Sequence, residues 1–310
     1  MSFTIIPVGT EIDFLGRTRL FVAISLLLIG GGMVALFLNG LNQGIDFKGG
    51  TVVQIRTQEV VPLDEVRDAL RTVGLGDVVI QEYGSPRDLL IRTAAGDEEV
   101  GAKIKASLLK QFGDKQVEVE RQEQVGPQVG ADLREQAMLA IVYALGMVVI
   151  YITVRFEFKY AVAAIIALIH DVALTIGAFA VTGLEVDLTV VAAVLTIVGY
   201  SLNDTIVVFD RIRENHRENI QLPVTDVINR SVNETLSRTV LTSGTTLVVV
   251  IALFFLGGEV IHDFAFALLV GIVVGTYSSI FIASPVVALW DRMGRKDEEA
   301  DGDAVSSSRA

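Results

Sequence analysis

Six long apolar stretches dominate this sequence, and each is long enough to cross a membrane as a helix. A helix needs about 18 or more largely uncharged residues to cross the hydrocarbon core of a bilayer. The composition agrees, because the chain is 51% hydrophobic and its mean hydropathy is clearly positive at +0.54, which together favour a membrane protein. The sequence therefore predicts a polytopic α-helical membrane protein with six transmembrane helices. The predicted spans are residues 20–41, 137–154, 160–184, 188–209, 239–258 and 264–290.

The first span has some features of a secretory signal peptide. It is longer than a typical signal core, however, and it ends in Asn39-Gly40-Leu41-Asn42 instead of a small-x-small cleavage site. We therefore expect it to stay in place as a membrane anchor.

Basic residues gather in the connections on one side of the predicted spans. They precede the first span, lie between the second and third and between the fourth and fifth, and follow the sixth. The two short connections on the other side contain neither Lys nor Arg. The positive-inside rule then places both termini in the cytoplasm. The expected cytoplasmic parts are residues 1–19, the loop 210–238 and residues 291–310, whose acidic end, 297–310, is predicted to be solvated and disordered.

The polar segment 42–136, between the first two spans, is long enough to form a small domain on the extracytoplasmic side. Its apolar spacing predicts strands and helices in the order βαββαβ. This is the order of the α+β ferredoxin-like fold, in which two helices cover one face of an antiparallel sheet. The expected strands are 51–58, 77–84, 88–94 and 115–123, and the expected helices are 62–74 and 97–113.

Few ionisable residues lie within the predicted spans, and they are the candidate functional residues. His170 and Asp171 lie near the middle of the third span, Asp204 lies in the fourth, and Arg238 marks the start of the fifth. An intramembrane carboxylate costs about 2.5–3.5 kcal/mol on insertion scales and more often lines an ion or proton path than serves a structural role alone. The structural alternatives are a snorkelling anchor for Arg238 and an interior polar contact for His170.

Asp204 and Arg238 are expected at similar depths, because they lie on consecutive antiparallel spans. Burial favours the protonated carboxyl, whereas a nearby cation favours the carboxylate. A cation that approaches and withdraws would therefore make Asp204 take up and release a proton as the helices move. One proton crossing the membrane supplies about 2.3 kcal/mol per 100 mV. Small residues near these positions are predicted to let the helices approach closely: Gly199, Ser201, Ser243 and Gly244.

Several function classes lack their motifs in this sequence. It has no G-x-x-x-x-G-K-[ST] loop, no H-E-x-x-H motif and no cysteine. Ser201 and His170 could form the dyad of an intramembrane serine protease, but the G-x-S-G-type setting of the nucleophile is absent. We expect no enzymatic activity and no cofactor or metal. The net charge of −12 argues against nucleic acid as the main partner.

Four stretches of the sequence read as motifs: "EIDFLGRTR" (11–19), "NQGIDFKGGT" (42–51), "VGYSLNDTIVVFDRIREN" (198–215) and "NETLSRTVLTSGTTL" (233–247). They resemble the SecD/SecF family, which belongs to the resistance-nodulation-division superfamily. The resemblance covers most of residues 11–292, and the motif in the fourth span is specific.

In "NQGIDFKGGT" we expect Asp46 and the Gly49-Gly50 pair to shape the chain between the first span and the first strand, with no ligand.

The resemblance implies a subunit of the Sec protein-export machinery in the cytoplasmic (inner) membrane. It implies a partner of the same plan, SecD, and assembly with the SecYEG channel in the lipid membrane. The pair would use the proton motive force to draw unfolded preproteins outward. It also implies that Asp204 and Arg238 lie in the proton pathway, with His170 and Asp171 added from the family's frequent His-Asp at this place. The family's principal proton-carrying Asp lies in SecD.

Two alternatives stay open at this point. The chain could be half of a proton-coupled exporter of small molecules or lipids, although such exporters usually carry both six-span halves and larger external domains. It could also be a non-transporting scaffold of the export complex, in which case Asp204 would be a structural contact.

Overall fold

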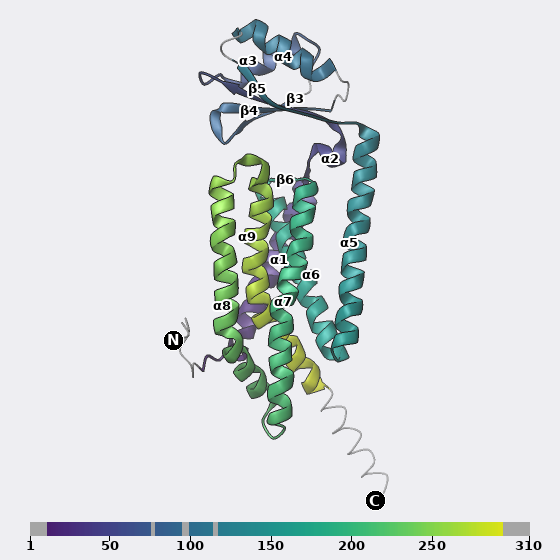
Figure 1. Cartoon of the computed structure of the whole chain (residues 1–310), viewed down its shortest axis with the longest axis vertical. Coiled ribbons are helices and arrows are strands. Elements are labelled where there is room, and N and C mark those ends of the chain that lie inside the picture. The colour runs from purple at the N-terminus through teal and green to yellow at the C-terminus, as the bar shows by residue number, and fades with distance from the viewer. Residues whose placement is uncertain (1–10, 76–77, 95–98, 114–116, 294–310) are drawn as a thin grey trace, which may run out of the picture. The chain divides into compact units, whose positions relative to one another are not determined.

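The computed structural model describes residues 11–75, 78–94, 99–113 and 117–293. The predicted acidic end, 297–310, lies outside the described residues. The chain divides into two compact units (Figure 1). The sheet unit comprises 42–142 and 185–191, and the helical unit comprises the rest.

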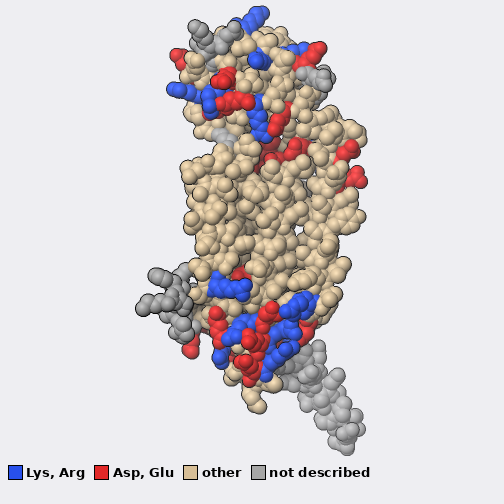
Figure 2. All heavy atoms as spheres, in the orientation of Figure 1, with Lys and Arg blue, Asp and Glu red and all other residues tan. Residues whose placement is uncertain are grey.

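Among the described residues, six helices are long and apolar enough to cross a membrane, as predicted. Figure 2 shows that, on the face drawn, the middle part of the helices carries almost no charged side chains. The sixth helix consists of α9 and a π-helical turn, Ser279–Ala283, followed by further helix to Met293. The helices are α1 (Thr18–Asn39), α5 (Pro127–Arg155), α6 (Phe158–Thr182), α7 (Leu188–Glu218), α8 (Val224–Leu256) and α9 (His262–Ser278).

Three helices extend well beyond the predicted spans, by about two turns or more. α5 begins at Pro127, a residue suited to the first turn of a helix because it lacks an amide hydrogen. α7 continues to Glu218 and α8 begins at Val224, so most of the predicted loop 210–238 is helical. Ion pairs one turn apart support these polar extensions, with Arg211 bound to Glu214 and Arg230 to Glu234. Hydropathy alone could not locate these helix ends.

Burial differs between the helices of the helical unit. In their most apolar segments α6 and α9 are the most buried, whereas α1, α5 and α8 are largely exposed. The core packs alanines of α6 (Ala163, Ala164 and Ala167) against Phe209 of α7 and Ile228 of α8. Polar side chains on the inner faces of α6, α7 and α9 are therefore enclosed by protein.

Two glycines allow a close crossing of α1 and α6. A Cβ added to Gly32 of α1 would lie 2.8 Å from the Cα of Gly177 of α6, and one added to Gly177 would lie 3.1 Å from the Cα of Gly32. Small residues allow such backbone contact between membrane helices. The crossing fixes which side chains of α1 and α6 meet two turns away.

The sheet unit has the predicted ferredoxin-like topology. Its four-stranded sheet has the order β3-β4-β2-β5, and every neighbouring pair is antiparallel. Val53 and Ile55 of β2 lie opposite Ile91 and Leu89 of β4, and these four side chains form one core with α3 and α4. The elements are β2 (Gly50–Thr57), α3 (Leu63–Arg71), β3 (Val78–Tyr83), β4 (Ser85–Thr93), α4 (Glu99–Phe112) and β5 (Val117–Val125).

Three short elements of the sheet unit were not predicted. β1 (Asn42–Gln43) pairs in parallel with β6 (Glu185–Val186), and α2 (Ile45–Lys48) follows β1. Asp46 in α2 accepts a hydrogen bond from the backbone N–H of Leu188, the first residue of α7 (3.1 Å). This contact satisfies one of the free amides of a helix start.

The Gly49-Gly50 pair provides the turn and the close backbone approach expected of it. Gly50 has φ +126°, and a Cβ there would lie 2.5 Å from the carbonyl oxygen of Thr93. Gly49 has φ +72°, and a Cβ there would lie 2.8 Å from the Cα of Pro127. Only glycine fits both positions without strain.

Candidate functional site

Asp204 of α7 is buried, with 9% of its surface exposed, and hydroxyl groups bind both of its carboxylate oxygens. Thr239 of α8 donates to Oδ1 (2.6 Å), and Ser279 donates to Oδ2 (2.7 Å). A hydroxyl can donate to a carboxylate and can also rotate to accept from a protonated carboxyl. These contacts therefore suit both protonation states of Asp204.

Ser279 begins the π-helical turn, and the local sequence explains that turn. Pro285 lacks an amide hydrogen, and its ring would clash with the carbonyl group four residues earlier in a regular α-helix. The wider turn relieves this conflict, and the hydroxyl of Ser284 donates to the carbonyl oxygen of Ser279 (2.8 Å). Single π-helical turns often occur at functional sites. Here the turn begins at a residue that binds Asp204.

A second buried cluster surrounds Asp171, whose surface is 0% exposed. His170 Nδ1 lies 2.8 Å from its Oδ1, and Ser201 of α7 donates to its Oδ2. His170 Nε2 lies 2.8 Å from the hydroxyl oxygen of Tyr277 and 3.0 Å from that of Ser25. If Nδ1–H donates to the Asp171 carboxylate, Nε2 is the acceptor for these hydroxyl groups. Four helices thus contribute to one hydrogen-bonded chain.

The two clusters meet on α7. Ser201 binds Asp171, and Asp204 lies three residues later on the same helix. Residues three apart are neighbours on a helix surface, with Cβ atoms about 5–6 Å apart. The sequence-predicted residues Asp204, Asp171 and His170 therefore occupy two adjacent polar clusters in the interior of the helical unit.

Arg238 lies next to the Asp204 cluster but is not ion-paired with it. It is exposed and directly precedes Thr239, which binds Asp204. Its charge is close enough to act on Asp204 through space. Within the part of the chain that the structure describes, the two side chains form no ion pair within 4 Å. The structure thus has the cation near the carboxylate but separated from it.

The structure places two of the four small residues named from the sequence against a neighbouring helix. Ser201 is buried against α9, where a Cβ on Gly275 would lie 3.0 Å from the Cβ of Ser201. Ser243 is buried and accepts a hydrogen bond from Thr276 (2.8 Å). Among the described residues of this chain, a Cβ at Gly199 or Gly244 would meet nothing within 4 Å.

Four hydroxyl residues of the two clusters were not predicted from the sequence. Hydroxyl side chains are common in membrane helices and carry no charge that would mark them. These residues are Ser25, Thr239, Tyr277 and Ser279.

The packing of α7 against α9 does have a signal in the sequence. Gly271 and Gly275 have the small-xxx-small spacing, and they lie against Ile197 and Ser201 of α7.

Among the described residues, no group of three His, Cys, Asp or Glu side chains could hold a metal ion.

Two family descriptions match this chain. "Protein export membrane protein SecD/SecF, C-terminal" matches residues 104–293, and "SecD/SecF GG Motif" matches residues 34–59. The matched regions include α5 to α9, the Gly49-Gly50 pair and every residue named in the two polar clusters except Ser25.

Curated relatives and solved structures agree with these matches. The chain is 50% identical to the protein translocase subunit SecF of Desulfurispirillum indicum, over 90% of this chain and 91% of the relative. It is 41% identical to that of Pseudomonas aeruginosa, over 94% of this chain and 95% of the relative. A crystal structure of SecDF, a translocon-associated membrane protein from Thermus thermophilus, matches with a TM-score of 0.85 and 40% identity. That match covers 93% of this chain and 40% of the SecDF chain, so the chain spans about two fifths of the length of the solved structure.

Proposed function

This chain belongs to the SecD/SecF family of protein export membrane proteins, and we propose that it is a non-enzymatic subunit that couples proton movement to preprotein export. Asp204 is the central residue of this proposal. The observation that carries it is a buried carboxylate whose two oxygens are both bound by hydroxyl groups of neighbouring helices. An intramembrane carboxylate in such a setting is typical of proton pathways.

The proposed partner is SecD, and the pair acts with the SecYEG channel on unfolded preprotein. The length of the SecDF chain supports the partner, because this chain matches only 40% of it and leaves room for a second set of spans. Both termini are proposed to face the cytoplasm and residues 42–136 the opposite side, as the basic connections favour.

The proposed coupling step is a change in the distance between Arg238 and Asp204. When the guanidinium group is distant, burial favours the protonated carboxyl; when it is close, the carboxylate is favoured and the proton leaves. Thr239 and Ser279 link this change to α8 and to the π-helical turn, because both helices bind the carboxylate directly. His170 and Asp171 are proposed to extend the path through Ser201.

Arg238→Met is expected to remove most of the gradient-dependent part of export, because the variant has no cation to draw the proton from Asp204. Arg238→Lys is the matched control and should keep much of that part, since lysine retains the charge. The measurement is export of a precursor into vesicles that contain SecD, the SecYEG channel and each variant, with and without a proton gradient. Equal gradient dependence in Arg238→Met and the unaltered chain would favour a scaffold role instead.

A further inference from the structure

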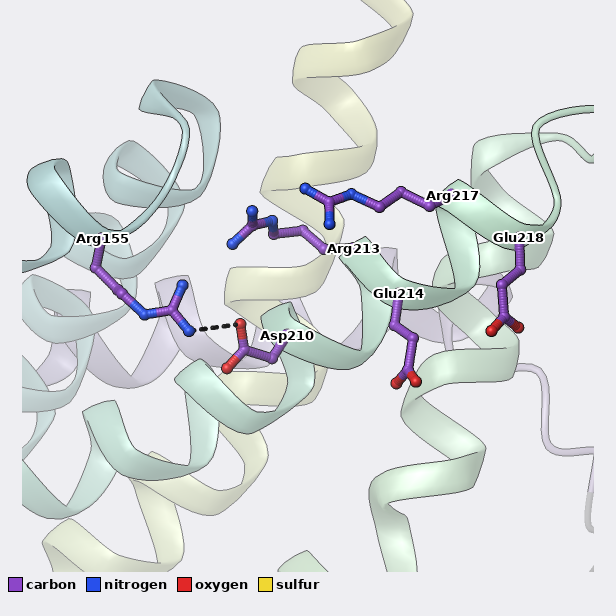
Figure 3. A pocket seen from close by; sticks show the side chains of 6 residues that line it. All are labelled: Arg155, Asp210, Arg213, Glu214, Arg217 and Glu218. Atoms are coloured by element: carbon purple, nitrogen blue, oxygen red, sulfur yellow. Dashed lines mark ion pairs between the residues drawn. The ribbon is translucent and has the colours of Figure 1, made fainter.

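A charged cavity of about 430 Å³ lies in the helical unit, beyond the apolar part of α7. It forms where α5 ends and where the polar extension of α7 begins, away from the two clusters described above. Arg155 of α5 lines it together with five residues of α7 (Figure 3). The residues from α7 are Asp210, Arg213, Glu214, Arg217 and Glu218.

The orientation of the side chains, not their net charge, favours an anion in this cavity. Three arginines and three acidic residues line it, so the formal charges cancel. Figure 3 shows that the three arginine side chains extend toward one another, while those of Glu214 and Glu218 extend in a different direction. Glu214 is also engaged by Arg211 (2.6 Å), which does not line the cavity. Among the described residues, the one ion pair within the cavity lining joins Asp210 to Arg155, at 3.6 Å.

One aromatic ring contacts two of the guanidinium groups. The guanidinium groups of Arg155 and Arg213 lie 5.0 Å and 5.9 Å from the centroid of the buried Phe156 ring. Stacking on one ring fixes two like charges in place. Across the residues that the structure describes, Arg213 and Arg217 form no ion pair with a carboxylate, and the buried Nε of Arg213 has no hydrogen-bond acceptor. An anion between them would supply the missing acceptor and reduce the repulsion.

The surroundings of the cavity are those of a membrane interface. Val154, next to Arg155, is 84% exposed, and Phe158 at the start of α6 is 65% exposed. The Phe158 ring packs edge-on against Trp290 at 5.6 Å. Exposed apolar side chains beside aromatic and basic residues mark the level of lipid headgroups. An acyl chain can therefore lie on this apolar surface while its headgroup reaches the arginines.

We propose that this cavity binds the phosphate group of an anionic phospholipid. The guanidinium fork matches phosphate oxygens in geometry and charge. Basic pockets between membrane helices are suited to anionic headgroups. Arg213 and Arg217 provide the free donors, and Arg155 closes the site from α5. This inference does not depend on the proposed role in export.

The test compares lipid binding to the full-length chain and to three variants. The chain is purified in detergent, and bound phosphatidylglycerol and phosphatidylcholine are counted by native mass spectrometry over a range of lipid concentrations. We expect the unaltered chain to prefer phosphatidylglycerol. Arg213→Gln and Arg217→Gln should each weaken that binding about fivefold. Arg217 is exposed, so its replacement leaves the core intact.

The control variant is Arg292→Gln. Arg292 is an exposed cation near the end of the sixth helix that does not line the cavity, so its loss should leave phosphatidylglycerol binding unchanged. An equal loss in all three variants would mean that only overall charge attracts the lipid and would overturn the proposal. Equal binding of both lipids to the unaltered chain would do the same. Displacement of phosphatidylglycerol by millimolar inorganic phosphate would assign the site to a soluble phosphate instead of a lipid.

Discussion

Asp204→Asn is expected to abolish the gradient-dependent part of export and to leave the gradient-independent part unchanged. Asparagine has the shape of aspartate but cannot take up or release a proton. Its carbonyl oxygen can still accept from Thr239, and the hydroxyl of Ser279 can turn to accept from the new amide. The contacts between the helices therefore persist while the titrating group is lost.

Asp204→Asn is tested by measuring precursor export into vesicles with and without a proton gradient. A matched control variant is measured in parallel. Asp226→Asn makes the same chemical change at an exposed residue in the first turn of α8 and should export like the unaltered chain. The gradient-dependent part of export with Ser279→Ala should lie between those with Asp204→Asn and Asp226→Asn. This variant keeps the carboxyl group of Asp204 but removes one of its two hydroxyl donors. Full gradient dependence in Asp204→Asn would show that this carboxyl group is only a structural contact.

Gly32→Leu is expected to destabilise the helical unit by about 1–3 kcal/mol, because overpacking of a close contact forces the backbone apart. Its Cβ would lie 2.8 Å from the Cα of Gly177. That Cα belongs to the backbone of α6, so it cannot rotate away as a side chain could. Ser25 lies two turns from Gly32 on α1, as His170 does from Gly177 on α6. Separation of the two helices would therefore also break the contact between Ser25 and His170, now 3.0 Å.

Gly31→Leu is the control for this steric argument. It adds the same side chain one residue earlier, where a Cβ would meet nothing within 4 Å. Thermal unfolding of the purified variants in detergent should give a lower unfolding temperature for Gly32→Leu and little change for Gly31→Leu. The close crossing would be unimportant for stability if both variants unfolded at the same temperature as the unaltered chain.

The candidate carboxylates could be found in the sequence because charge is rare inside apolar stretches. Asp171 and Asp204 stand out against their neighbours for this reason, and both are buried in the structure. The six spans followed from the length of the apolar stretches, and the order of strands and helices in the sheet unit followed from the spacing of apolar residues. These features depend on residues close together in the sequence.

The partners of the carboxylates depend on packing and could not be found in the same way. Thr239 and Tyr277 look like ordinary hydroxyl residues until α8 and α9 are placed beside α6 and α7. The position of Ser279 depends in addition on the π-helical turn before Pro285, which shifts the register of the helix. The separation of Arg238 from Asp204 also could not be predicted, because the spacing of residues along two helices does not determine the distance between their side chains.

Proton movement across the vesicle membrane during export tests the central claim most directly. A pH-sensitive dye inside vesicles that contain SecD, the SecYEG channel and this chain would record it while a precursor is exported. The account predicts export-coupled proton movement with the unaltered chain and with Asp226→Asn, and none with Asp204→Asn. Unchanged coupling in Asp204→Asn would contradict the account and would show that the proton route does not pass through Asp204.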